Sequence, residues 1–141
     1  MINKNFKILK IDHIAIAVNS NKTGSEIFNL LGMNIGISEL VDSEKVNVVK
    51  VSTEDKGHAI ELLEASDNSS TITKFISKKG QGLHHIALEV DNIKEAINYL
   101  KANHVQLIYN SPKIGANNKL ITFIHPNSTP GILLELCQSA P

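Results

Sequence analysis

The chain has 141 residues, 42% hydrophobic and 20% charged, which is typical of a folded globular domain and excludes a disordered or fibrous protein. Fourteen Lys and Arg residues balance fourteen Asp and Glu residues, and this net charge of zero argues against a nucleic-acid-binding protein. The single cysteine, Cys137, excludes an internal disulfide. The start "MINKNFKILKIDHI" lacks a secretory signal, and no apolar run reaches the roughly 18 residues of a membrane span, so a cytoplasmic protein is expected.

The first predicted strand is "IDHIAIAV" at residues 11–18. Side chains alternate along a strand, so one face carries a histidine and small residues, and the other carries large apolar residues. The small face consists of His13, Ala15 and Ala17, and the large face consists of Ile14, Ile16 and Val18. A helix is expected to cover the large face.

That helix is predicted in "NSNKTGSEIFNLLG", where apolar residues keep helical spacing and Gly32 ends it. Three strands should follow, at residues 35–41, 46–52 and 59–65. A short connecting helix is predicted next, at about residues 70–80, with Ser69 or Ser70 as its cap and Gly80 as its end.

The second half repeats this order. "LHHIALEV" at residues 83–90 matches the first strand, and "DNIKEAINYLKANHV" predicts a helix capped by Asp91 or Asn92. The strands "VQLIY", "LITFIH" and "ILLELCQ" follow. We therefore expect an α+β fold with two tandem βαβββ modules, at about residues 8–66 and 82–138, within one domain that spans residues 1–141.

Each half also ends in a strand that carries a glutamate among apolar residues. Glu61 follows His13 by 48 positions, and Glu135 follows His85 by 50, so the two kinds of residue occupy equivalent places in the two halves. A lone strand histidine is usually structural, and a lone strand glutamate is usually solvated. The repetition of both makes coincidence a poor explanation.

Buried carboxylates need a partner, and a divalent cation can serve two carboxylates and two imidazoles together. The predicted ligands of one divalent ion are His13, Glu61, His85 and Glu135. This mixture of nitrogen and oxygen ligands suits Co, Mn, Ni, Fe or Zn without choosing among them.

These segments resemble a known family. The segments "IDHIAIAV", "IELLEA", "GLHHIALEVDNI", "PKIGA" and "FIHPNSTPGILLELC" look like the vicinal oxygen chelate superfamily, which includes glyoxalases, and most closely like its methylmalonyl-CoA epimerases. The resemblance spans about residues 11–137. It implies a cupped mixed sheet around the metal and gives the same four ligands.

The resemblance further implies the reaction, in which (R)- and (S)-methylmalonyl-CoA of propionate metabolism interconvert. The proton at the α-carbon is removed and returned through a metal-stabilised enolate, and Glu135 resembles the family's acid–base carboxylate. Some members carry a second carboxylate on the strand that corresponds to "VNVVKV", which contains none. Glu44 and Lys50 are weak substitutes, and each is also explained as a solvated surface residue.

The expected partner is an acyl-CoA, and a homodimer is expected because sheets of this kind often dimerise. Gly115 in "SPKIGANNKL" stands where family members have a glycine, whereas Asn117 and Asn118 replace the more usual glycines. Lys113 and Lys119 could bind a CoA phosphate, although ordinary surface lysines explain them slightly better.

Three alternatives share the fold. A lactoylglutathione lyase (glyoxalase I)-like isomerase usually has an Asp-Pro-Asp-Gly type turn where this chain has "HPNSTPG". A ring-cleaving dioxygenase needs only three protein ligands, and Glu61 would be a fourth. A metal-free small-molecule-binding, drug-sequestering protein would lack the His and Glu set.

Overall fold

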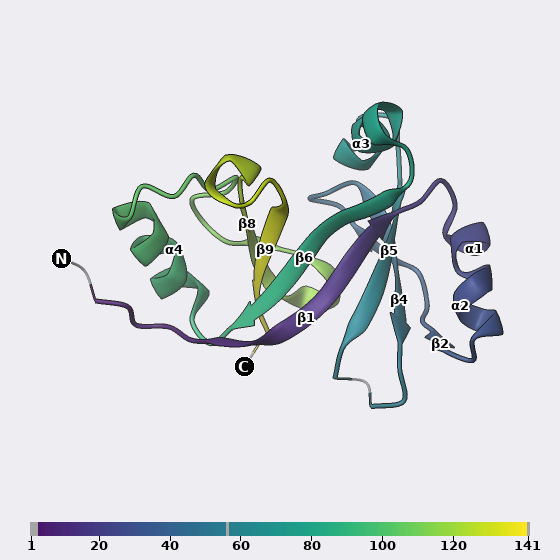
Figure 1. Cartoon of the computed structure of the whole chain (residues 1–141), viewed down its shortest axis with the longest axis horizontal. Coiled ribbons are helices and arrows are strands. Elements are labelled where there is room, and N and C mark those ends of the chain that lie inside the picture. Colours follow the sequence, from purple (N-terminus) through teal and green to yellow (C-terminus); the bar gives the residue numbers. More distant parts are fainter. Residues whose placement is uncertain (1–2, 56, 141) are drawn as a thin grey trace. The chain divides into compact units, whose positions relative to one another are not determined.

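The computed structural model describes residues 3–55 and 57–140 (Figure 1). Counting only these residues, His13–His84 form one compact unit, and Met1–Asp12 with His85–Pro141 form the other. The boundaries fall inside two strands, β1 (Ile8–Ala17) and β6 (Gly82–Val90). In the described part of the chain, no helix has both the length and the apolarity of a membrane span.

The unit His13–His84 holds the first βαβββ module. Its remaining elements are α1 (Asn21–Gly24), α2 (Glu26–Leu30), β2 (Asn34–Ile35), β3 (Glu39–Val41), β4 (Val46–Ser52), β5 (Ala59–Ala65) and α3 (Thr71–Lys79). The strands lie in the order β2-β4-β5-β1, and β3 also pairs with β4. β1 runs parallel to β5, whereas β4 is antiparallel to it.

One face of this sheet is covered by helices, as the alternation predicts. A buried core forms there from Val18, Val49, Val51 and Leu62. Ile16 of β1 and Phe28 of α2 pack against it. Ile14 is 40% exposed, so the helical cover protects only the later part of the large face of β1. The opposite face keeps the small residues Ala15 and Ala17 fully buried.

The predicted first helix is instead two short ones. The Ser20 hydroxyl accepts a hydrogen bond from the Thr23 N–H and caps α1, which ends at Gly24. A Cβ on Gly24 would lie 3.1 Å from Val18, so the chain approaches β1 closely at this point. Ser25 then begins α2, and the prediction of one continuous helix is wrong.

The predicted strand at residues 35–41 is also divided. Ile35 pairs with Val51, and Glu39 pairs with Val48, so three residues on this side face two on β4. This extra residue is a β-bulge, which separates β2 from β3. The prediction of one strand is therefore wrong at residues 36–38.

The connecting helix α3 agrees with its predicted ends. The Ser70 hydroxyl accepts a hydrogen bond from the Ile72 N–H, and the helix ends at Gly80, whose φ is 76°. Ser70 and Ile72 are both buried, so the helix is fixed at its beginning.

The other unit repeats the module. After β6 come α4 (Ile93–Ala102), β7 (Lys113–Ile114), β8 (Leu120–Ile124) and β9 (Leu133–Gln138), with short 3₁₀ turns at Ala116–Asn118 and Pro126–Ser128. The strand order is β6-β9-β8-β7, with β6 parallel to β9 and the other pairs antiparallel. The α+β fold with two βαβββ modules of mixed pairing is thus confirmed.

The core of this unit lies under α4. Ile93, Ala96 and Ile97 of the helix pack with Val90 and Leu136 of the strands. Asn92 caps the helix through the Glu95 N–H, as predicted. The N-terminal segment joins this core through buried Phe6, and the Lys7 N–H donates to the Asp91 carboxylate at 2.7 Å.

"VQLIY" at residues 105–109 is not a strand. It runs beside β8, where the Ile108 N–H donates to the Phe123 carbonyl, but Leu107 forms only an isolated bridge with Ile124. The His125 N–H also donates to the Gln106 carbonyl, and side chains satisfy two further backbone groups, since the Ser128 hydroxyl accepts from the Gln106 N–H and the Thr122 hydroxyl donates to the Tyr109 carbonyl. The third strand of this half is β7 instead.

Candidate functional site

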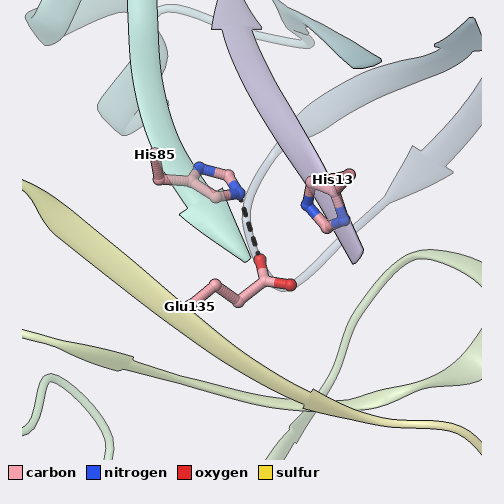
Figure 2. Close-up of side chains that lie close together, drawn as sticks. All are labelled: His13, His85 and Glu135. Atoms are coloured by element: carbon pink, nitrogen blue, oxygen red, sulfur yellow. Dashed lines mark ion pairs between the residues drawn. The ribbon is translucent and has the colours of Figure 1, made fainter. Parts of the chain in front are cut away.

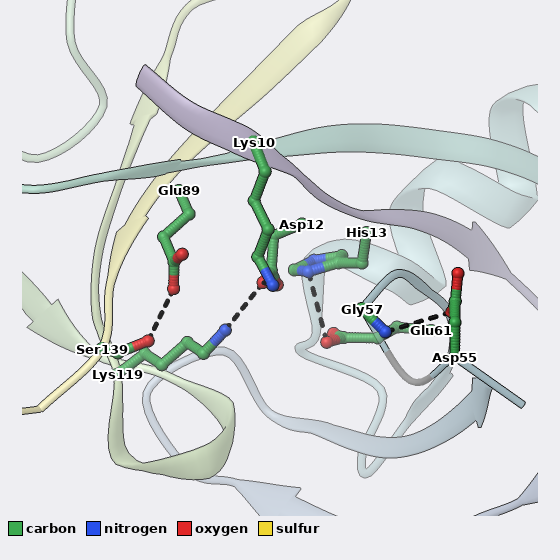
Figure 3. A network of polar contacts seen from close by, with 9 residues as sticks. All are labelled: Lys10, Asp12, His13, Asp55, Gly57, Glu61, Glu89, Lys119 and Ser139. Atoms are coloured by element: carbon green, nitrogen blue, oxygen red, sulfur yellow. Dashed lines mark hydrogen bonds and ion pairs between the residues drawn. The ribbon is translucent and has the colours of Figure 1, made fainter. Parts of the chain in front are cut away.

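The first buried histidine–glutamate pair lies in the unit His13–His84 (Figure 3). His13 Nδ1 is 3.3 Å from Glu61 Oε2. The two residues are only 4% and 7% exposed. β1 and β5 are parallel, with Ala15 opposite Glu61, so the histidine and the glutamate point from the same face of neighbouring strands.

The second pair lies in the other unit and is built in the same way. His85 Nε2 is 3.3 Å from Glu135 Oε1, and Figure 2 shows the ring directed at the carboxylate. These residues are 5% and 6% exposed. β6 is parallel to β9, with Ala87 opposite Glu135. The sequence repeat therefore corresponds to a repeat of geometry.

Alanines lie beside the paired residues on each face. Ala15, Ala17 and Ala87 have no exposed surface, and their single methyl groups add little bulk beside the polar pairs. The carboxylate and the imidazole of each pair thus lie beside small, buried side chains.

Each pair fits a divalent metal. Two ligand atoms at about 2.1 Å from one ion lie roughly 3.0–3.4 Å apart in octahedral or tetrahedral coordination. The 3.3 Å separation within each pair lies in this range. All four side chains are buried and able to offer one ligand atom each. Burial of a carboxylate is costly, and a bound cation would offset part of that cost.

The strand on the other side of each glutamate differs between the halves. Lys50 of β4 is directly opposite Glu61, whereas Phe123 of β8 is directly opposite Glu135. The Phe123 ring meets the His85 ring edge to face, with centroids 5.4 Å apart, and therefore fixes the imidazole. Neither pairing could be read from the sequence, because both depend on strand register.

An ion pair holds the start of β1 to the loop before β8. Lys119 Nζ is 3.0 Å from Asp12 Oδ1, and Lys10 Nζ is 3.8 Å from the same oxygen (Figure 3). Burial lowers the pKa of Lys119, but the hydrogen bond and the charge of Asp12 outweigh it and raise the pKa overall. Lys119 is thus already paired with a carboxylate, which weakens its predicted role at a CoA phosphate.

The ion pair between Asp12 and Lys119 was not predicted from the sequence. The available signal was the position of Asp12 immediately before a candidate ligand, in "IDH". Lys113, the other lysine considered for phosphate, lies over the Tyr109 ring with Nζ 5.1 Å from the centroid. Its role at a phosphate stays a prediction.

The conformation of the loop between β7 and β8 accounts for its glycine and its two asparagines. A Cβ on Gly115 would lie 2.9 Å from the buried Ile121 side chain, so a larger residue would have to displace that side chain. Asn117 and Asn118 both adopt positive φ, 57° and 58°. Asparagine tolerates this region better than most residues, which explains how it can replace glycine here.

Three further residues serve the structure. Cys137 is fully buried, and burial followed by the charge of Glu135 holds the pKa of its thiol far above the usual range. His84 packs edge to face on Phe75, with centroids 5.0 Å apart. His125 Nδ1 accepts a hydrogen bond from the Asn127 N–H.

The two substitutes considered for a second acid–base group lie in different settings. Glu44 is half-buried in the turn before β4, and its carbonyl accepts from the Ser70 hydroxyl. Lys50 is exposed, on the same face as Glu61.

Comparison with known proteins identifies the family. Residues 12–123 match the family model described as Glyoxalase/Bleomycin resistance protein/Dioxygenase superfamily. The chain is 42% identical to "Uncharacterized protein YqjC" of Bacillus subtilis over 130 residues, covering 92% of this chain and 91% of that protein. It is 37% identical to mitochondrial methylmalonyl-CoA epimerase of Dictyostelium discoideum over 129 residues, covering 90% of this chain and 76% of that one.

A solved structure agrees. A variant of Streptomyces coelicolor methylmalonyl-CoA epimerase in complex with 2-nitronate-propionyl-CoA matches with a TM-score of 0.88 and 29% identity, covering 95% of this chain and 96% of that one. The family model covers His13, Glu61 and His85 and ends before β9, which carries Glu135, whereas the Streptomyces structure matches 95% of the chain. The chain therefore belongs to the glyoxalase/bleomycin resistance protein/dioxygenase superfamily and, within it, to the methylmalonyl-CoA epimerase family of isomerases.

Proposed function

We propose that this isomerase interconverts (R)- and (S)-methylmalonyl-CoA with the help of one divalent metal ion held by both His–Glu pairs. The observation that carries the proposal is the repetition, in both modules, of a buried His–Glu pair with a 3.3 Å separation. The related Streptomyces enzyme, whose complex contains an acyl-CoA analogue, supports the substrate class.

The proposed ligands are His13, Glu61, His85 and Glu135, and the donor set does not distinguish Co, Mn, Ni, Fe and Zn. When bound, the metal would supply a Lewis acid for the oxygen atoms next to the reacting carbon. The protein's own contribution is to hold four donors on rigid strands and to line the adjacent faces with alanine methyl groups.

Glu135 is the proposed acid–base group. Its carboxylate removes the proton from the α-carbon on one side, and a second group returns a proton on the other side to invert the centre. β4 has valine, asparagine and lysine but no carboxylate between Val46 and Val51, so the residue that serves the other side is not assigned.

The direct test is exchange of the α-proton of methylmalonyl-CoA in deuterated solvent. Metal-loaded protein is expected to incorporate deuterium and to equilibrate the epimers, as followed by mass spectrometry and chiral analysis. The glutathione hemithioacetal of methylglyoxal serves as the control substrate, because its turnover without exchange of methylmalonyl-CoA would support a lactoylglutathione lyase-like enzyme instead.

Metal affinity is expected to fall as the pH decreases through the ordinary histidine range, near roughly 6.5, because imidazole binds metal only when deprotonated. Titration with Co²⁺ or Zn²⁺ between neutral and mildly acidic pH measures the change. An affinity that stays constant over this interval would indicate a site without histidine ligands.

Several further expectations stay predictions. These are a homodimer, a cytoplasmic location, and a single domain with module limits at about residues 8–66 and 82–138.

A further inference from the structure

Lys50 lies beside a proposed metal ligand. Ala15 of β1, Glu61 of β5 and Lys50 of β4 follow one another across three hydrogen-bonded strands. Residues directly opposite each other on adjacent strands have Cβ atoms about 4.5–5.5 Å apart and point to the same face. The lysine side chain therefore lies next to the Glu61 side chain, on the face of the sheet opposite the helix-covered core.

The sheet is open at this position. On the same face of β4, Val46 and Val48 are each 5% exposed, whereas Lys50 is exposed. The bulge at residues 36–38 lies next to it, and the Gly36 N–H donates to the Lys50 carbonyl at 2.8 Å. A Cβ on Gly36 would lie 3.0 Å from the Lys50 carbonyl oxygen and 3.7 Å from the Lys50 Cβ, so a glycine here avoids crowding the lysine.

Lys50 also has a charge that is not used within the fold. Its ammonium makes no ion pair with any residue in ranges 3–55 and 57–140, and the carboxylate of Glu61, which is opposite it on β5, contacts His13. A lysine placed opposite a glutamate would ordinarily be expected to pair with it. Here the cation stays available to a bound molecule.

Charge balance indicates the chemical class of the molecule that Lys50 would bind. Two carboxylate ligands neutralise a divalent ion, so the site as a whole carries no surplus positive charge for an anionic acyl group. A dicarboxylic acyl thioester brings one negative charge, and removal of its α-proton adds another. Burial of these charges beside Glu61 requires a further cation, and Lys50 lies in the adjacent position on the strand.

We propose that Lys50 binds the free carboxylate of the acyl group and makes the site selective for dicarboxylic over monocarboxylic acyl-CoA. The proposal rests on the proposed function, because it assumes an acyl-CoA bound next to Glu61. The acyl end, and not the CoA phosphates, is the part of such a ligand that lies near the proposed metal ligands.

The test compares binding of malonyl-CoA and propionyl-CoA, which differ in the free carboxylate, by calorimetry with metal-loaded and metal-free protein. Lys50→Met should weaken malonyl-CoA binding by roughly 10-fold or more, the usual size of a charge-assisted hydrogen bond, and leave propionyl-CoA binding within about twofold. Lys50→Arg, which keeps the charge, should retain most of the malonyl-CoA affinity.

Lys22→Met is the matched control, because it also removes one exposed lysine. Lys22 belongs to α1, which lies on the opposite face of the sheet, where the adjacent Asn21 forms hydrogen bonds with Asn47 and Glu64. Its malonyl-CoA affinity should equal that of the wild type. Equal losses for both ligands in Lys50→Met, an unchanged malonyl-CoA affinity, or Lys50→Arg as weak as Lys50→Met would each overturn the proposal.

Failure of the Lys50 proposal can be distinguished from failure of the proposed epimerase function. Wild-type protein that exchanges the α-proton of methylmalonyl-CoA, together with a Lys50→Met variant that still distinguishes the two thioesters equally well, refutes the role of Lys50 alone. Wild-type protein that neither binds malonyl-CoA nor exchanges the proton refutes both.

Discussion

Glu135→Gln is expected to retain bound metal but to lose turnover of methylmalonyl-CoA by a factor on the order of 10² or more, the usual size of a general acid–base contribution. The amide keeps an oxygen that can coordinate, at nearly the same volume, in a position that is only 6% exposed. It cannot accept the proton. Metal content by elemental analysis and turnover by epimer analysis measure the two effects separately.

The isotope pattern refines this test. Two separate bases place solvent deuterium in the product epimer and little in the returned substrate, whereas one shared base lets the original proton come back. Unimpaired epimerisation by the Gln variant, with metal still bound, would leave Glu135 as a ligand only. The matched change Glu61→Gln should reduce turnover less, because Glu61 is proposed as a ligand without a proton-transfer role.

His85→Ala should weaken metal binding by on the order of 10²-fold or more, since loss of a direct ligand should exceed the 10–100-fold typical of outer-shell partners. The substitution also leaves Glu135 without its partner at 3.3 Å. The adjacent His84→Ala supplies the control, because His84 packs on Phe75 and is not a proposed ligand. Calorimetric titration with metal distinguishes them.

A His85→Ala protein that binds metal as tightly as wild type would contradict the ligand assignment. Circular dichroism melts of both variants are needed beside the titration, because His85 also contacts the Phe123 ring. The expected result is a His84→Ala variant with wild-type affinity and a His85→Ala variant that is folded but has lost high-affinity binding.

The parts of the fold that follow strict periodicity were predictable from the sequence. Alternation placed His13 with Ala15 and Ala17, and the repeat paired each histidine with a glutamate, as the two 3.3 Å contacts now show. The ends of α3 were also predictable, because a serine cap and a terminal glycine are local signals.

Other features depend on contacts between distant segments. A bulge of one residue separates β2 from β3, and its position is set by pairing with β4 and not by the residues at 36–38 themselves. "VQLIY" has strand-like composition, yet the hydroxyls of Thr122 and Ser128 take two of the hydrogen bonds that a continuous strand would make with backbone groups. The position of Lys50 opposite Glu61 likewise became visible only with the register.

Lys50 and Phe123 occupy equivalent positions in the two modules, each opposite a glutamate, and they differ in chemistry. A chain that performs the same βαβββ module twice gives equivalent surroundings to its two glutamates, with Ala15 and Ala87 on one side of each. A cation opposite one glutamate and an aromatic ring opposite the other make these surroundings inequivalent, so the strand register breaks the symmetry of the repeat at this position.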